Sequence, residues 1–355
     1  MVAAAYLLLL TFASGDLKHF GAAKLRALNA SPYDGAAISV SGPYDSSHHS
    51  LDEFDPALVE LRGGSHKQIW PMVFLNRIIG CVKCPRLASA AVFGRIKVMD
   101  VQDRAGALGD FYAQFGIALA LAAALKAPGV VVDPEPYNDE SITFERLSDR
   151  LGQDRERTAV QLEQIGAHMA DMTAHVYPGA VIWFLYTGLD RMAGHKAATP
   201  PAAYIALGAL RRAQGRSIPL KLVSGGELLG YCFSSLKRLK RVTDDRKISF
   251  APLMAVYPQL ALAGAITLWN DSSSRRGWLL NQSGQEAECG RAGDLNGRDF
   301  IPLLRYLLSS YPYVWIYAAG VADYNPYGSK APIFNQLIDD ARSGSNTTPW
   351  AKPPD

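Results

Sequence analysis

The amino-acid sequence predicts an α/β fold, a single-domain (β/α)8 TIM barrel over residues 1–343, followed by a disordered tail over residues 344–355. Eight short apolar runs alternate with longer helical segments, and this alternation is typical of a parallel sheet covered by helices. A last helical segment follows the eighth run, which favours a closed barrel over an open sheet. No G-x-G-x-x-G or P-loop pattern follows a predicted strand, as a nucleotide-binding open sheet would require.

The first element is an apolar segment over residues 1–15 that has two interpretations. Its apolar run and small residues resemble the core and cleavage site of a secretory signal peptide. However, no Lys or Arg precedes the run, whereas the start of a secretory signal is normally basic. Removing the segment would also delete one of eight strands and leave an open barrel edge. We therefore interpret it as the first strand and expect a cytoplasmic location, with secretion as the alternative.

The other strands are predicted from short apolar runs that lie between turn residues. The clearest run is Val130, Val131 and Val132, because consecutive valines are typical of a strand that is buried on both faces. The eight strands are expected at residues 6–12, 36–41, 69–76, 129–133, 180–187, 220–224, 265–269 and 313–318.

The helices are bounded by prolines and by long polar loops. Pro32, Pro128, Pro178 and Pro312 each precede a predicted strand, and proline ends a helix sharply. Long polar loops follow the strands instead, on the side where a barrel builds its active site. The helices are expected at residues 17–28, 51–62, 106–125, 144–176, 202–214, 236–257, 300–310 and 333–342.

The composition limits the classes of partner that we expect. With 48% hydrophobic and 19% charged residues, the 355-residue chain has the composition of an ordinary soluble globular protein. The formal net charge of +3 is too small to indicate a nucleic-acid partner. No apolar stretch reaches the ~18 residues that a membrane span needs, so no membrane partner is expected either. The sequence does not define an oligomeric state.

The cysteines and histidines give no ligand pattern. Cys81 and Cys84 form a lone C-x-x-C, and Cys232 and Cys289 lie far away, whereas a structural zinc site needs a second pair or two histidines. No histidine or lysine ends a predicted strand, and the pair that includes His49 is expected on the surface of a loop. We therefore expect neither a metal nor a cofactor.

Two carboxylates follow the valine run directly. Asp133 and Glu135 are spaced i, i+2 and therefore project to the same side of the strand. Pro134 and Pro136 cannot donate to a ladder, so strand pairing should end here. Carboxylates at the C-terminal end of a parallel barrel strand are where such enzymes keep their acid and base groups. The alternative is a helix-capping acid in a solvated turn.

The other strand ends supply further candidates. Glu227 follows the sixth strand and the pair Gly225–Gly226, which could also cradle a phosphate, and Asp271 after the seventh strand is a reserve. The catalytic candidates are therefore Glu135, Asp133, Glu227 and Asp271. Amides and aromatic rings could bind a substrate, although core packing is the alternative for each ring. These binding candidates are Asn76, Tyr137, Asn138, Tyr186, Tyr231, Trp269, Trp315 and Tyr317.

The segment Asp133-Pro134-Glu135 resembles the D-x-E element that ends the fourth strand of chitinase-like glycoside hydrolases. The whole chain likewise resembles a glycoside-hydrolase-type barrel of a bacterial family. The resemblance implies that Glu135 is the general acid and that Asp133 assists it. The role of Glu227 rests on its position after the sixth strand alone.

The expected function is that of a glycosidase, a hydrolase of carbohydrate metabolism that cleaves a glycosidic bond of a carbohydrate substrate with paired carboxylates. We expect Glu135 and Glu227 to stand ~6.5–9.5 Å apart, as in inverting enzymes, with ~5–5.5 Å and retention as the alternative. The competing hypotheses are a carbohydrate-binding pseudo-enzyme and a lyase or isomerase of a small oxygenated metabolite.

Overall fold

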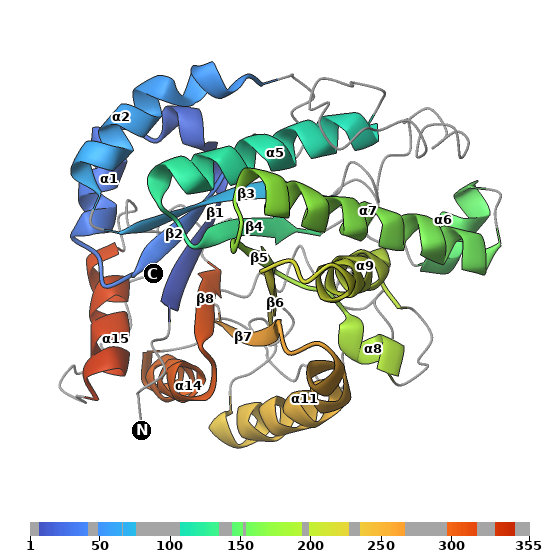
Figure 1. The fold of residues 1–355 in the computed structure, drawn as a ribbon. Coiled ribbons are helices and arrows are strands. Elements are labelled where there is room, and N and C mark those ends of the chain that lie inside the picture. The colour runs from blue at the N-terminus through green and yellow to red at the C-terminus, as the bar shows by residue number, and fades with distance from the viewer. Residues whose placement is uncertain are drawn as a thin grey trace.

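The computed structural model describes residues 7–41, 49–65, 67–75, 107–134, 144–151, 154–193, 199–226, 235–266, 297–317 and 331–344. Eight parallel strands form a closed barrel in the order β1 to β8, and helices surround it (Figure 1). β1 (Leu7–Asp16) pairs with β2 (Gly35–Ser39) and with β8 (Tyr313–Tyr317), which closes the barrel. The predicted (β/α)8 fold class is confirmed.

The remaining strands are β3 (Gln68–Phe74), β4 (Gly129–Asp133), β5 (Val181–Phe184), β6 (Lys221–Ser224) and β7 (Leu260–Ile266). The helical elements are η1 (Leu17–His19), α1 (Ala22–Asn29), η2 (Leu51–Phe54), α2 (Asp55–Gly64), α5 (Ala107–Leu125), α6 (Phe144–Leu151), α7 (Arg155–Val176), α8 (Leu189–Ala193), α9 (Pro201–Gly215), α11 (Leu236–Val256), α14 (Gly297–Ser310) and α15 (Ala331–Ser343). Figure 1 shows α5 and α7 on one side of the barrel and α11 and α14 on the opposite side.

The N-terminal apolar segment forms a strand of the barrel, as predicted. β1 extends past Phe12 to Asp16, with a register irregularity between these two residues. The strand is therefore longer than the sequence predicts, and it places Lys18 directly after its end, in η1.

The barrel interior is a packed core. Side chains alternate along each strand, so every second residue faces inward. Large rings come from β3, β5 and β8, and the indole of Trp183 packs edge-on against Trp70 at 5.8 Å and against Tyr313 at 5.4 Å between ring centroids. The inward positions of β7 carry only small side chains. The interior cluster comprises Ala37, Trp70, Met72, Phe74, Val131, Val181, Trp183, Leu185, Val223, Ala261, Ala263, Ala265 and Trp315.

A second and larger core lies between the strands and the surrounding helices. It receives the alternate strand residues, such as Val130 and Val132 of β4, together with the inner faces of the helices. The valine run is therefore buried on both faces, as the sequence predicts, with Val131 in the interior cluster.

Helices α7 and α9 approach each other closely because glycines stand at their contact. A Cβ atom added to Gly166 would lie 1.8 Å from the carbonyl oxygen of Ile205, and one added to Gly208 would lie 2.0 Å from that of Glu163. Arg212 of α9 forms a two-pronged ion pair with Asp171 of α7, with N–O distances of 2.8 and 2.6 Å. The two helices therefore pack with their backbones in contact.

Several elements differ from the predictions. The predicted helix over residues 144–176 is two helices, and α7 has its own cap because Asp154 accepts a hydrogen bond from the Arg157 N–H at 2.7 Å. The predicted strand over 265–269 begins earlier, at Leu260, because alanine and glycine dominate β7 and signal a strand weakly. The short helix α8 carries no clear sequence signal.

One helix among the described residues passes the test of length and hydropathy for a membrane span. It is α5, with an 18-residue window over Leu108–Leu125, so the prediction that no stretch reaches this length is wrong. The window is 67% buried, and the helix packs against β3 and β4. α5 is therefore a core helix of the barrel. The predicted tail, apart from Gly344, lies outside the described residues.

Candidate functional site

Asp133 is the last residue of β4 and faces the barrel interior. It shares the inward side of the strand with Val131, and it is 3% exposed. Its neighbour on β3 is Phe74, and its carbonyl oxygen accepts a hydrogen bond from the Leu75 N–H at 2.7 Å. The carboxylate therefore lies at the C-terminal mouth of the barrel, where the sequence predicts it.

The end of β6 is aligned with Asp133 across β5. The ladders continue past the strand ends, since the Leu185 N–H donates to Val132 at 3.0 Å and the Gly225 N–H donates to Phe184 at 2.7 Å. Neighbouring strands lie about 4.8 Å apart, so Asp133 and Gly225 are about 10 Å apart along the sheet. A Cβ atom at Gly225 would lie 2.1 Å from the carbonyl oxygen of Leu185, which is why a glycine is required there.

Arg246 of α11 joins the ends of β6 and β7. The pairing of these strands ends at Ser224 and Leu262. Beyond that point the guanidinium donates to the carbonyl oxygens of Ala263 at 2.6 Å, Ser224 at 2.9 Å and Gly225 at 2.8 Å. The guanidinium therefore bridges β6 and β7 where the backbone hydrogen bonds between these strands have ended.

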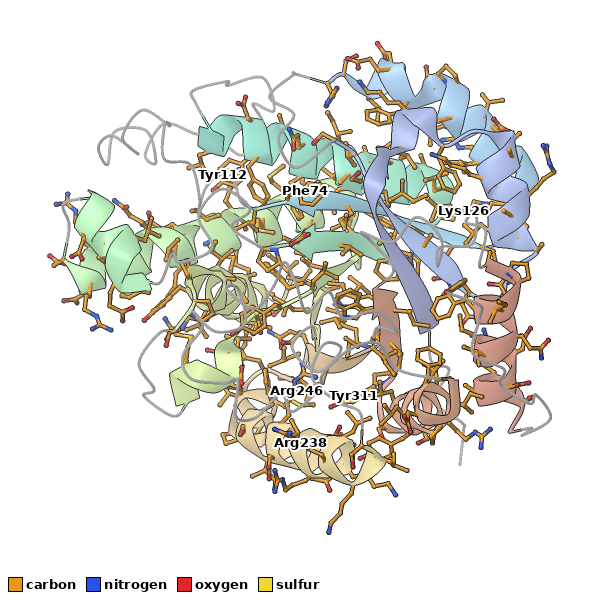
Figure 2. The ribbon with its side chains drawn as sticks, turned by 180° about the vertical axis from the view of Figure 1, so that it is seen from behind. Phe74, Tyr112, Lys126, Arg238, Arg246 and Tyr311 are labelled. Atoms are coloured by element: carbon orange, nitrogen blue, oxygen red, sulfur yellow. The ribbon has the colours of Figure 1, made fainter. Side chains whose placement is uncertain are left out.

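The surroundings of Arg246 are aromatic. Its guanidinium carbon lies 5.4 Å from the ring centre of Phe250 and 5.7 Å from that of Tyr311, and Figure 2 shows Arg246 and Tyr311 on the same side of the barrel. In the described part of the chain, no ion pair joins Arg246 to a carboxylate. Among the described residues, carbonyl dipoles and ring faces therefore surround its positive charge.

Two buried hydroxyl groups link the ends of β5 and β6. The hydroxyls of Thr187 and Ser224 are 2.7 Å apart, and Thr187 also accepts a hydrogen bond from the Leu189 N–H at 3.3 Å. These hydrogen bonds therefore connect the ends of β5 and β6 to each other and to the start of α8.

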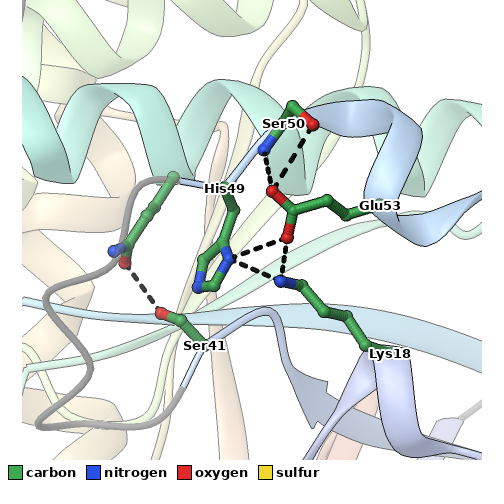
Figure 3. Close-up of polar contacts among 6 residues, drawn as sticks. Lys18, Ser41, His49, Ser50 and Glu53 are labelled. Carbon is green, nitrogen blue, oxygen red and sulfur yellow. Dashed lines mark hydrogen bonds and ion pairs between the residues drawn. The ribbon is translucent and has the colours of Figure 1, made fainter.

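A second polar cluster, formed by Lys18, His49 and Glu53, lies after β1 and β2 (Figure 3). The Lys18 ammonium lies 2.6 Å from His49 Nδ1 and forms an ion pair with Glu53. It also lies 5.4 Å from the ring centre of Phe54. His49 Nδ1 also lies 3.3 Å from the Glu53 carboxylate, so the three polar side chains contact one another.

Glu53 is strongly acidic in this cluster. The hydrogen bond from Lys18 is the main cause that lowers its pKa from 4.5 to about 2, and the Ser50 N–H adds to the effect. The Ser50 N–H donates to the carboxylate at 3.0 Å as part of a capping box. Glu53 is therefore ionised at neutral pH.

The residue pattern of the sequence does not predict this cluster. The His49 side chain is 6% exposed, so it is more buried than expected, and His48 lies outside the described residues. The reason is that β1 runs to Asp16 and brings Lys18 against the start of η2. The capping-box spacing of Ser50 and Glu53 was the available signal.

The structure describes four of the predicted site residues. Asp133 lies at the mouth, and Tyr186 follows β5 and is partly buried. Trp315 is 1% exposed within the interior core and offers no exposed face to a ligand. Tyr317 ends β8. The other predicted residues lie outside the described part of the chain, namely Asn76, Glu135, Tyr137, Asn138, Glu227, Tyr231, Trp269 and Asp271.

Metal ligation has no support in the described part of the chain. No group of three or more His, Cys, Asp or Glu side chains there could hold a metal ion. The four cysteines lie outside the described residues.

Comparison with known proteins gives no family. No family model matches the chain, and no curated protein matches it. Among solved structures, the chain is similar to a Yersinia pestis DHPS (dihydropteroate synthase) with a pterine–sulfa conjugate, at 9% identity and a TM-score of 0.39. The alignment covers 97% of this chain and 96% of that chain.

These findings correct the expected family. The structure that the comparison finds is a dihydropteroate synthase and not a glycoside hydrolase, and no matching family model or curated relative places the chain among glycosidases. The predicted glycosidase function is therefore wrong, together with its hydrolase and carbohydrate keywords. The resemblance rested on the short element Asp133-Pro134-Glu135, and an acid at the end of a barrel strand serves many chemistries.

Proposed function

We propose that this chain is an enzyme in which Asp133 acts as an acid–base group on a small substrate at the C-terminal mouth of the barrel. The observation that carries the proposal is the burial of this carboxylate at the end of β4, facing inward. The described part of the chain has one other buried acid, Asp340. That residue lies in α15, where Gln336 donates to it at 3.0 Å.

The position of Asp133 favours catalysis over a structural role. The C-terminal end of a barrel strand is where barrel enzymes place their acid and base groups. The neighbours of Asp133 along and across the strand include Val131, Phe74 and Leu185, whose side chains are apolar. A carboxylate in such surroundings can exchange a proton with a bound substrate.

The barrel interior supports a substrate that enters from the mouth. The rings of Trp70, Trp183 and Trp315 are each at most 1% exposed and fill the barrel. The described part of the interior is therefore filled, and we expect a ligand to reach Asp133 from the C-terminal side, where barrel enzymes bind their substrates. We place the enzyme in the cytoplasm, because β1 is part of the barrel and the apolar helix α5 is a core helix.

The test is an Asp133→Asn variant incubated with an extract of small polar metabolites, with conversion followed by mass spectrometry. The wild-type protein should consume a substrate catalytically, and the variant should do so about 10²–10⁴-fold more slowly, the usual contribution of a general acid or base. Asp340→Asn is the matched control, since it changes the other buried acid and should keep the rate. Unchanged turnover by a folded Asp133→Asn protein would overturn the proposal.

A further inference from the structure

The peptide bond between Gly225 and Gly226 has an N–H group that the proposed acid–base chemistry at Asp133 does not use. Its carbonyl oxygen accepts a hydrogen bond from Arg246 at 2.8 Å. No cis peptide is found in the described part of the chain, so the Gly226 N–H lies on the opposite edge of the peptide plane and points away from the guanidinium. Gly226 is buried, and among the described residues its N–H has no hydrogen-bond acceptor.

Arg246 strengthens this N–H as a donor. A cation bound to the carbonyl polarises the whole peptide unit, and hydrogen bonds in such chains reinforce one another. The three acceptors of the guanidinium among the described residues are neutral carbonyl groups, so its positive charge remains close to the Gly226 N–H. A backbone N–H with a positive charge behind it is suited to bind an anionic oxygen.

The neighbouring described positions on this side of the mouth carry small side chains or none. Gly225 has no side chain, and the inward positions of β7 at this level are Ala263 and Ala265. The bulky interior rings come from β3, β5 and β8 instead. Gly226 directly follows Gly225. Gly225 is aligned with Asp133 across a single intervening strand, β5.

We propose that the Gly226 N–H, supported by Arg246, binds an anionic oxygen of the ligand, either a carboxylate or a phosphate, in the mouth that holds Asp133. The reaction of that ligand rests on the function proposed above, but its binding does not. The site selects an anionic ligand over a neutral one, because a neutral ligand gains little from the charge of Arg246.

The binding can be measured directly by nuclear magnetic resonance on the full chain with 15N-labelled glycine. The Gly226 signal is assigned from its loss in Gly226→Ala. Inorganic phosphate and acetate are then titrated separately, with sodium chloride at equal ionic strength as reference. We expect a saturable shift of the Gly226 signal with one of the two anions and not with chloride. A response to phosphate identifies a phosphoryl group as the ligand, and a response to acetate identifies a carboxylate.

Two variants of α11 test the part played by Arg246. Arg246→Met should raise the dissociation constant of the anion about tenfold or more, the usual effect of losing a charge-assisted interaction. Arg241→Met removes an exposed arginine of the same helix and should leave the constant unchanged. Asp133→Asn should also bind the anion, which separates this inference from the proposed acid–base role.

Equal shifts with chloride, no saturation with either anion, or unchanged binding by a folded Arg246→Met protein would overturn the inference. If Arg246→Met fails to fold, the wild-type titration decides alone, because the Gly226 signal reports the contact itself.

Discussion

Asp133 and Glu53 are carboxylates on the same rim of the barrel, and they differ in exposure. Asp133 is 3% exposed, whereas the Glu53 side chain is 40% exposed and receives hydrogen bonds from Lys18 and Ser50. Exposure alone therefore does not set the acidity of a carboxylate, because the pKa of Glu53 falls to about 2 through its hydrogen-bond donors.

The pKa of Glu53 predicts a pH-dependent contribution to stability. A carboxylate whose pKa is lower in the folded state stabilises the fold above its unfolded pKa of 4.5, and this contribution disappears as the pH falls towards about 2. The difference in free energy of unfolding between the wild-type protein and Glu53→Gln should therefore be constant above pH 4.5 and shrink below it. Urea unfolding at stepped pH measures this difference.

The control for this titration is Glu60→Gln, which changes an acid of α2, the helix that directly follows η2. Glu60 forms no hydrogen bond or ion pair with the described residues, so its replacement should leave the pH profile of stability unchanged. A pH-independent difference for Glu53→Gln would show that Lys18 does not hold the carboxylate in solution.

At the scale of elements, the contact of α7 and α9 depends on two glycines. Gly166→Ala or Gly208→Ala would place a methyl group against backbone atoms of the facing helix, so the helices must separate. We expect a loss of about 1–3 kcal/mol in the free energy of unfolding for each variant, the usual cost of overpacking. Thermal and urea unfolding measure it.

Gly63→Ala is the matched control for the glycine substitutions. Gly63 also lies inside a helix, α2, but a Cβ atom there meets nothing within 4 Å. Since alanine favours a helix over glycine, this variant should gain up to about 1 kcal/mol. A gain of the same size for Gly208→Ala would contradict the close packing of α7 and α9.

The elements also show what the sequence could predict. β4 was predictable because Val130, Val131 and Val132 give a strong local signal. β7 was placed too late because its alanines and glycine signal a strand weakly, although every residue of it is buried. Asp133 followed from β4, so one part of the candidate site was accessible from the sequence.

The contacts of Arg246 and of Lys18 were not accessible in the same way. Arg246 lies in the middle of a basic helix, and its contacts with β6 and β7 arise only when α11 docks on the barrel. Lys18 meets His49 and Glu53 across more than 30 residues of chain. Such contacts depend on tertiary packing, which periodicity and spacing do not encode.

At the scale of the whole molecule, the barrel is closed by the pairing of its first and last strands. β1 forms ladders with both β2 and β8, and no other described strand can replace it. Arg342 of α15 adds a second link between the chain ends, since it donates to the Asp34 carboxylate at 3.0 Å and to the Pro32 carbonyl oxygen. Closure therefore couples the two ends of the sequence.

A chain that begins at Leu17 tests this closure. Without β1, the edges of β2 and β8 would be left unpaired, and open edges of this kind associate with other chains. We expect the shortened chain to lose its cooperative thermal transition and to aggregate, as followed by circular dichroism and light scattering. A chain that begins at Tyr6 keeps all of β1 and should unfold like the full-length protein. If the chain from Leu17 instead folded and melted as the full-length protein does, β1 would not be a strand of the stable barrel, and residues 1–15 would fit a cleaved signal peptide better.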